Sequence, residues 1–438
     1  MKHLETNSLD ALREALRHLD AGFADLPPFE SSDPALNGVP AVLREVAEKL
    51  RDNYPYFHPL YAGQMLKPPH PVARAAYALA TWINPNNHAL DGGRASSAME
   101  KEAVAQIAAM FGWHEFLGHL TGGGTMANLE ALWVAGRLNP GKTIVDSESA
   151  HYTHERIGGV LQLPFEAIRA NPDGSIDCTA LEQRAARGDI GCVVATLGTT
   201  GTGAVDALPE ILGLRDRFGF RVHVDAAYGG YFTLADNLTA SARAAFDSIP
   251  RADSIVIDPH KHGLQPYGCG CVLFRDPAVG ALYKHDSPYT YFSSKDLHLG
   301  EISLECSRPG ASAVALWATQ RLLPLVAGGE FAAGLSSSRA AALDLARRLS
   351  DDDRWIVPFP PELDIVVWAP RAGSASAIFE RAAGRDLHLA LIRLPRRCFG
   401  LAGPEGDGEH VLCLRSVLMK PEHAAWVDGI VERLRDVE

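Results

Sequence analysis

The sequence predicts an α/β protein with a mostly parallel central sheet flanked by helices, an N-terminal arm and a smaller C-terminal α/β domain. Two observations favour this fold. Short runs that are apolar throughout alternate with amphipathic helical patterns between residues 142 and 275, and strands buried on both faces are typical of parallel sheets covered by helices. The chain of 438 residues is 47% hydrophobic, which is enough for more than one structural unit.

Three regions are expected along the chain. Residues 1–70 combine a mixed-charge helical pattern with the proline- and aromatic-rich run NYPYFHPLYAG, which suits an arm or lid. Residues 71–330 are expected to form the large domain, and residues 331–438, where helix and strand alternate again, a small α/β domain. The first helices expected in the large domain span 71–83 and 97–113, and its strands span 142–146, 190–198, 220–227, 253–258 and 269–275.

Composition excludes several classes of function. A net charge of −12 without a Lys/Arg cluster argues against nucleic-acid binding. We see neither a signal peptide nor an apolar stretch long enough to span a membrane, so we expect no membrane partner and a cytoplasmic location. Seven scattered cysteines fit a reducing compartment better than a disulfide framework. Cys269 and Cys271 lack a second half-site, so we expect buried thiols there and no metal.

A glycine-rich run, TGGGTMAN at 121–128, leads directly into a helical pattern. Backbone amides at a helix N-terminus, with the Thr125 hydroxyl beside them, can bind a phosphate group. The alternative is a flexible turn. A nucleotide is disfavoured, because the run lacks the Lys-Ser/Thr ending of a P-loop and does not match the G-x-G-x-x-G pattern of a nicotinamide dehydrogenase.

Two ionisable residues follow later strands. Asp225 ends the apolar run in RVHVDAAYGG, and a buried carboxylate needs a partner such as a protonated pyridine nitrogen. Lys261 follows the next run, in DPHKHG, where histidine neighbours and a partly apolar approach favour an amine that can attack a carbonyl. Read alone, Asp225 could be a helix cap or ion pair and Lys261 a surface residue.

The order of these features supports a shared site. The glycine run, Asp225 and Lys261 each accompany an apolar run, so they can converge on one sheet edge, where α/β proteins bind ligands. Pyridoxal 5′-phosphate (PLP) offers a phosphate, a ring nitrogen and an aldehyde, the groups these features would contact. His151, after the run at 142–146, could cover one face of the ring. His154 is an alternative, and either histidine could be an ordinary cap.

With these residues in place, the chain resembles the group II PLP-dependent amino-acid decarboxylases of fold type I. The resemblance extends from NYPYFHPLYAG to CLRSVLMKPEH and is most specific in HVDAAYGG and DPHKHG, with support from SESAH, ATLGTTGTGAVD and CSRPGA. It implies a Schiff base between PLP and Lys261, an Asp225 contact to the pyridine nitrogen, and His151 stacked on the ring. It further implies cofactor contacts from Gly124, Thr125, Thr200, Ala227, His260 and Ser307, and substrate contacts from Tyr61, Gln64 and Arg415.

One stretch departs from the aromatic and glutamate decarboxylases. In those enzymes a mobile loop carries a tyrosine that protonates the substrate carbon. The corresponding stretch of this chain is short, and in this respect it is more similar to the archaeal tyrosine/aspartate decarboxylases. Tyr289, Tyr291 and His298 are the nearest candidate donors. The short loop also resembles that of the sphingosine-phosphate lyases, so a retro-aldol lyase, an aldehyde-forming variant and, from another class, a non-catalytic interaction module remain alternatives.

The resemblance therefore implies α-decarboxylation of an L-amino acid to the amine and CO₂. It also implies a homodimer with shared active sites, in which the segment around Ser307 and Arg308 could reach the partner's phosphate. We find no cationic residue to assign to a distal carboxylate, which favours an aromatic or uncharged amino acid as the substrate.

Overall fold

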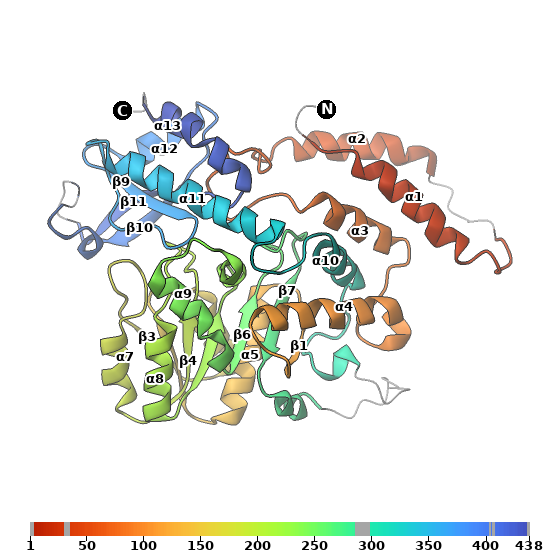
Figure 1. Cartoon of the computed structure of the whole chain (residues 1–438), viewed down its shortest axis with the longest axis horizontal. Helices are drawn as coiled ribbons and strands as arrows, with labels where there is room; N and C mark the ends of the chain where they lie inside the picture. Colours follow the sequence, from red (N-terminus) through yellow and green to blue (C-terminus); the bar gives the residue numbers. More distant parts are fainter. Residues whose placement is uncertain (1–3, 30–35, 285–297, 403, 405–407, 436–438) are drawn as a thin grey trace.

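A computed structural model describes residues 4–29, 36–284, 298–402, 404 and 408–435 of the chain. Within these ranges it is a mixed α/β protein with two sheets, and the predicted fold class is confirmed. The larger sheet fills the lower half of the view in Figure 1, and the smaller sheet lies above it with the C-terminal helices.

The larger sheet has seven strands in the order β1-β7-β6-β5-β4-β2-β3. Neighbouring strands are parallel except at β7, which runs antiparallel to both β1 and β6. Its strands are β1 (Leu117–Thr121), β2 (Thr143–Ser147), β3 (Phe165–Ile168), β4 (Ile190–Thr196), β5 (Arg221–Asp225), β6 (Ser254–Ile257) and β7 (Gly270–Phe274). Every residue of β4, β6 and β7 is buried, which explains why these runs are apolar throughout.

Helices cover both faces of this sheet (Figure 1). They are α3 (Pro71–Thr81), α4 (Leu90–Met110), α5 (Gly124–Leu138), α6 (Thr153–Leu161), α7 (Cys178–Ala185), α8 (Leu208–Phe218), α9 (Ala240–Asp247) and α10 (Gly310–Leu322). Short 3-10 helices are η1 (Leu36–Gly38), η2 (Gly230–Leu234), η3 (Ile249–Arg251), η4 (Pro277–Leu282), η5 (Leu299–Glu301), η6 (Arg396–Ala402) and η7 (Pro421–Ala425). The largest apolar cluster joins the sheet to α4, α8 and α10 through side chains such as Ile107, Leu212 and Leu316.

The five strands predicted in the large domain are all present, while β1 and β3 were not predicted. β1 has the sequence LGHLT, in which glycine and histidine interrupt the apolar pattern. β3 has only four residues, of which one is buried. The helix expected from residue 97 begins earlier, at Leu90, across a break at Gly93.

The smaller sheet is antiparallel, in the order β10-β11-β9-β8. Its strands are β8 (Trp355–Ile356), β9 (Ile365–Pro370), β10 (Ala390–Pro395) and β11 (His410–Val417), and its helices are α11 (Glu330–Ser350), α12 (Ala375–Ala383) and α13 (Val427–Leu434). The segment after the arm joins this unit, because Leu60 O accepts from His388 N and Ala62 O accepts from Val417 N. Domain boundaries at residues 70 and 330 stay a prediction.

The N-terminal arm consists of α1 (Ser8–Ala21) and α2 (Val39–Leu50), which project beside α3 in Figure 1. Neither helix contains a buried residue. Five apolar side chains that repeat on one side of α2 are exposed: Val39, Val42, Leu43, Val46 and Leu50. The apolar face of α2 therefore has no cover in this chain among the described residues.

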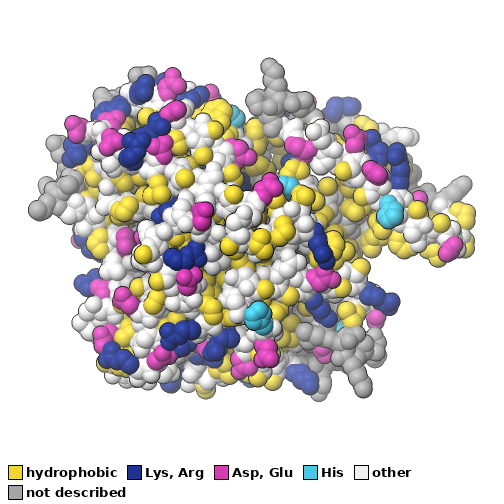
Figure 2. Space-filling model, in the orientation of Figure 1, with side chains coloured by type: hydrophobic (Ala, Val, Ile, Leu, Met, Phe, Trp, Pro, Cys, Tyr) yellow, Lys and Arg dark blue, Asp and Glu magenta, His cyan; other side chains and the backbone are white. Residues whose placement is uncertain are grey.

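The surface in Figure 2 shows basic and acidic side chains interspersed over the whole visible face. Within the described ranges, no helix is both long and apolar enough to cross a membrane. Over the same ranges, no three His, Cys, Asp or Glu side chains gather in a way that could hold a metal ion. Cys269 and Cys271 are buried thiols, and burial raises the pKa of both.

Candidate active site

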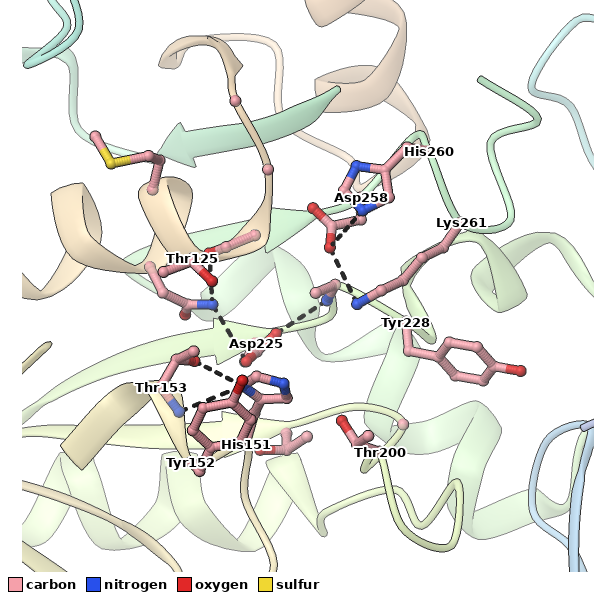
Figure 3. A pocket seen from close by; sticks show the side chains of 18 residues that line it. Thr125, His151, Tyr152, Thr153, Thr200, Asp225, Tyr228, Asp258, His260 and Lys261 are labelled. Carbon is pink, nitrogen blue, oxygen red and sulfur yellow. Dashed lines mark hydrogen bonds and ion pairs between the residues drawn. The ribbon is translucent and has the colours of Figure 1, made fainter. Parts of the chain in front are cut away.

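A cavity of about 450 Å³ lies at the edge of the larger sheet where β2, β4, β5 and β6 end and where the chain leaves β1. This is the edge at which a parallel sheet exposes its connecting loops. The predicted residues that line the cavity are Gly124, Thr125, His151, Thr200, Asp225, Ala227, His260 and Lys261. Figure 3 shows Asp225 near the centre of the site, with Lys261, His151 and Thr125 around it.

The glycine run forms the turn between β1 and the first residues of α5. Gly123 has a φ of +146°, which favours glycine. At Gly124, a Cβ atom would lie 2.7 Å from Oδ2 of Asp258, so any side chain there would strike a buried carboxylate. No side chain at these two positions covers the backbone amides at the N-terminus of the helix. A phosphate group can therefore lie against them.

Lys261 follows β6 and reaches the cavity from the loop that also contains His260 (Figure 3). Its Nζ lies 3.0 Å from Oδ2 of Asp258, and Nε2 of His260 lies 3.5 Å from the same oxygen. His260 is held in place because its Nδ1 bonds the carbonyl of Cys269 at 2.8 Å and its ring packs on Tyr267. Burial lowers the pKa of His260, which favours the neutral ring.

Asp225 is the last residue of β5, and its carboxylate is buried. Oδ1 accepts from the backbone N–H of Ala227 at 3.0 Å, while Oδ2 lies 2.8 Å from Nε2 of His154 and accepts from Asn128 at 3.3 Å. Burial on its own would raise the pKa of Asp225, but the bond and the charge of His154 hold that pKa well below its usual range. The carboxyl group is therefore an anion.

The two histidines after β2 occupy different places. His151 lines the cavity, with Nδ1 bonded to the Thr153 hydroxyl at 2.7 Å and its ring stacked on Tyr152. Burial lowers the pKa of His151. His154 lies in the first turn of α6 behind Asp225, is fully buried and does not line the cavity. Of the two, His151 is thus the one placed to cover a ring in the cavity.

Thr200 and Ala227 complete the inner wall. The backbone carbonyl of Thr200 accepts from Nη1 of Arg415 at 3.0 Å, so Arg415 lies directly behind the cavity wall. Arg415 also donates to Oε1 of Gln64 at 2.6 Å, and the N–H of Gln64 donates to the Tyr61 hydroxyl at 3.3 Å. Gln64 therefore connects the other two predicted substrate residues, Arg415 and Tyr61, although none of the three lines the cavity.

The remaining predicted residues lie elsewhere. Ser307 is exposed outside the cavity, and its hydroxyl accepts from Asn86 at 3.1 Å. Arg308 is buried and paired with Glu100 at 3.0 Å, and the reach of this segment to a partner subunit stays a prediction. His298 is buried away from the cavity and accepts from the backbone N–H of Leu90. Tyr289 and Tyr291 lie outside the described residues.

Several residues of the site were not predicted, and three of them make specific contacts. Asp258 directly follows β6 as Asp225 ends β5, a signal that could have identified it. Asn128 lies one turn into α5, where its Nδ2 also donates to Gly124 O at 2.9 Å. Tyr228 lines the cavity, and its hydroxyl donates to Oδ1 of Asp364, a residue 136 positions away, at 2.6 Å.

The arrangement fits the three polar ends of PLP. The N-terminus of α5 offers backbone amides to a phosphate. Asp225 offers an ionised carboxylate whose Oδ1 accepts one hydrogen bond among the described residues, which leaves a lone pair for a ring nitrogen. Lys261 offers an amine in the same cavity, and the buried Thr196 hydroxyl, which also lines it, has no hydrogen-bond partner in the described chain.

Comparison with known proteins agrees with this geometry. Residues 133–368 match the model of the pyridoxal-dependent decarboxylase conserved domain. The chain is 31% identical over 288 residues to an L-aspartate decarboxylase of Thermococcus kodakarensis, a match that covers 63% of this chain and 71% of that protein. It is 28% identical over 387 residues to an L-tyrosine decarboxylase of Enterococcus faecium, covering 65% and 63% of the two chains.

Solved structures share the fold over almost the whole chain. The crystal structure of Oryza sativa TDC with PLP and tryptamine superposes with a TM-score of 0.77 at 18% identity, and the match covers 98% of each chain. Mouse CSAD superposes with the same TM-score of 0.77 at 20% identity, over 96% of this chain and 91% of that chain.

Proposed function

The chain belongs to the pyridoxal-dependent decarboxylase family, and from this premise we propose that it removes the α-carboxylate of an L-amino acid as CO₂ and releases the corresponding amine. The membership rests on the family model, which matches more than half of the chain, and on the aspartate decarboxylase of Thermococcus kodakarensis. It confirms the predicted family, fold type I and the PLP cofactor. The protein is a PLP-dependent carboxy-lyase.

The cofactor's attachment points are assigned from the cavity. Lys261 Nζ would bind the aldehyde carbon, and the backbone amides around Gly124 and Thr125, with His260 beside them, would bind the phosphate. Thr200 is assigned to the side of the ring oxygen and Ala227 to the face opposite His151. When bound, PLP withdraws electrons from the Cα bond that breaks, provided that its ring nitrogen is protonated.

Two residues would maintain that state of the ring. Asp225 is an ionised acceptor buried in the cavity wall, so a proton on the ring nitrogen would be stabilised by its charge. His151 would cover one face of the ring and keep water from it. Its own Nδ1 is engaged by Thr153, which fixes the orientation of the imidazole.

Substrate recognition is assigned to the group behind Thr200. Arg415 is a buried guanidinium whose Nε has no hydrogen-bond partner among the described residues, so this N–H can donate to a carboxylate while the bonds to Thr200 and Gln64 remain. Tyr61 and Gln64 would set its position. Lys261 is the one Lys or Arg among the described residues that line the cavity, which favours an aromatic or uncharged substrate side chain.

We also propose a homodimer in the cytoplasm. The apolar face of α2 is exposed in the single chain, and a second copy of the chain would cover it. Ser307, exposed near the glycine run, would then be available to the partner's cofactor phosphate. The free thiols of all seven cysteines suit a reducing compartment.

One observation carries the proposal: Lys261, Asp225 and the N-terminus of α5 open into a single cavity of about 450 Å³. The test is a screen of the twenty L-amino acids with added PLP, in which released CO₂ and the amine are measured together with any aldehyde. We expect CO₂ and amine in equal amounts from a few amino acids. An aldehyde without CO₂ would instead identify a retro-aldol lyase, and aldehyde with CO₂ an aldehyde-forming variant. The absence of any product would contradict the proposal.

A further inference from the structure

His154 lies between two carboxylates that come from different strands. Its Nε2 is 2.8 Å from Oδ2 of Asp225, at the end of β5, and its Nδ1 is 3.0 Å from Oδ2 of Asp146, in β2. The imidazole has no exposed surface, and it is held by the first turn of α6. The three side chains thus form a buried row that ends at the cavity.

The geometry determines the charge of this row. An ionised carboxylate only accepts hydrogen bonds, so both ring nitrogens must carry a proton to bond both acids. Burial on its own would lower the pKa of His154, but its bonds to Asp146 and Asp225 raise it to about 9. Burial raises the pKa of Asp146, whose Oδ1 has no partner in the described chain. With both ring nitrogens protonated, the row consists of a carboxylate, an imidazolium and a second carboxylate.

The bond from His154 also determines which carboxylate oxygen of Asp225 is available to a ligand in the cavity. Oδ2 is occupied twice, by His154 and by Asn128. Oδ1 accepts only from the N–H of Ala227 among the described residues. A ring nitrogen in the cavity therefore meets an oxygen whose carboxylate is already ionised and fixed in orientation.

We propose that His154 is a positioning residue for Asp225, held as an imidazolium between Asp146 and Asp225 so that the Asp225 carboxylate stays ionised and keeps Oδ1 for the ring nitrogen of the cofactor. The role rests on the function proposed for Asp225. His154 itself does not line the cavity, so its effect on the cofactor passes through that carboxylate.

The competing explanation is that His154 only fills the interior between α6 and the sheet. The two explanations differ in what they predict for a cofactor without a ring nitrogen. If His154 acts through Asp225, its loss weakens only the ligands that use the ring nitrogen. If it acts only by packing, its loss weakens every ligand of the cavity equally.

The experiment compares PLP with its carbocyclic analogue, in which a C–H group replaces the ring nitrogen. Dissociation constants of both ligands are measured at neutral pH by titrating the full-length apoprotein and following visible absorbance. In the wild type we expect PLP to bind more tightly than the analogue. In His154→Leu we expect that preference to fall by at least about 10-fold, the usual effect of a lost charged hydrogen bond, while analogue binding changes little.

Two further variants make the test robust. His154→Gln keeps a polar side chain of similar length without the charge, and it serves if the leucine variant does not fold; its preference for PLP should also fall. Asp146→Asn removes the outer acid while the bond to Asp225 remains, so a smaller decrease is expected.

The matched control is His119→Gln. His119 is also fully buried and bonded to a carboxylate, Glu130, at 3.0 Å, but its hydrogen-bond partners Leu120, Glu130 and Arg308 do not line the cavity. Its preference for PLP over the analogue should equal that of the wild type.

The outcomes separate cleanly. An unchanged preference in both His154 variants, or an equal loss of affinity for both ligands, would overturn the role of His154. A wild type that binds PLP with the expected preference but releases no CO₂ from any amino acid would contradict the proposed function and leave this role standing.

Discussion

The Nζ of Lys261 lies 3.0 Å from Oδ2 of Asp258, a carboxylate with 3% of its side-chain surface exposed. Oδ1 of the same acid has no hydrogen-bond partner among the described residues. An ammonium group must lose a proton before its nitrogen can attack an aldehyde. Asp258 is therefore the carboxylate that would accept a proton from Lys261 when the cofactor is attached.

Asp258→Asn should slow cofactor attachment by about 10- to 100-fold, within the usual range for a lost general base. The rate is measured by stopped-flow absorbance after apoprotein is mixed with PLP. The substitution is nearly isosteric, and the amide can still bond Lys261, so folding should persist. The control is Asp253→Asn. Asp253 directly precedes β6, is largely buried and accepts a hydrogen bond from Val222 N, but it does not line the cavity. An attachment rate equal to that of the wild type would contradict a proton-transfer role.

Lys261→Ala should abolish both the visible absorbance of bound cofactor and all turnover, because no other lysine lines the described cavity. Absorbance spectra of the purified protein and CO₂ release provide the two measurements. Lys49→Ala, at an exposed ion pair on α2, is the control and should behave as the wild type. A Lys261 variant that kept both properties would rule out attachment at this residue.

Arg415→Gln should raise KM for the amino acid by about 10-fold or more, since an ion pair to the α-carboxylate is lost. The product amine has no carboxylate, so its inhibition constant should change little. This contrast separates carboxylate binding from a general disturbance of Thr200 and Gln64. Arg415→Lys, which keeps the charge, should recover part of the affinity. Equal weakening of substrate and amine would argue against the assignment.

The stability of the apoprotein should depend on His154 in a defined pH range. The pKa of His154 is raised from 6.5 to about 9 on folding, so its contribution is complete below pH 6.5 and is lost as pH rises through about 9. The contribution is on the order of 3 kcal/mol. The gap in free energy of unfolding between wild type and His154→Leu, measured by denaturant titration, should therefore be larger at pH 6 than at pH 9.5. A gap that grows with pH would refute this charge state.

The double variant Leu43→Glu/Val46→Glu should convert the proposed dimer into monomers. Both side chains lie on the apolar face of α2 and are at least 42% exposed in the single chain, so folding should not depend on them. Buried in an interface, the two new charges would each cost several kcal/mol. Sedimentation velocity gives the assembly state, with Arg44→Glu on the polar face as the control. A dimer that persists in the double variant would exclude this face as the interface.

Much of the larger sheet could be predicted because its strands are buried on both faces. β2, β4, β6 and β7 each show as a short apolar run, and β5 shows one in which only His223 is polar between its first and last residues. β1 could not be recognised, since Gly118 and His119 are explained only by the fold. A Cβ at Gly118 would overlap the Leu273 side chain on β7, and His119 pairs with the buried Glu130.

The candidate site was predictable where residues follow strands and was not where contacts cross the fold. The cavity-lining residues His151, Asp225 and Lys261 each sit at or just after the end of a strand in the sequence. His154 belongs to α6, and its two acids lie on β2 and β5, so only the arrangement of three elements reveals the row. The burial of Arg308 could not be read from the sequence either, because its partner Glu100 is 208 positions away.

The side-chain amide of Asn128 bonds both ends of the cavity: its Nδ2 donates to Gly124 O at 2.9 Å and to Oδ2 of Asp225 at 3.3 Å. The turn assigned to the phosphate and the acid assigned to the ring are therefore joined by this one side chain. Because one side chain joins both ends of the cavity, we expect little ordering of the backbone when the cofactor binds. Binding should therefore be accompanied by a small heat-capacity change and a modest loss of entropy. Calorimetric titration of the apoprotein with PLP measures both quantities.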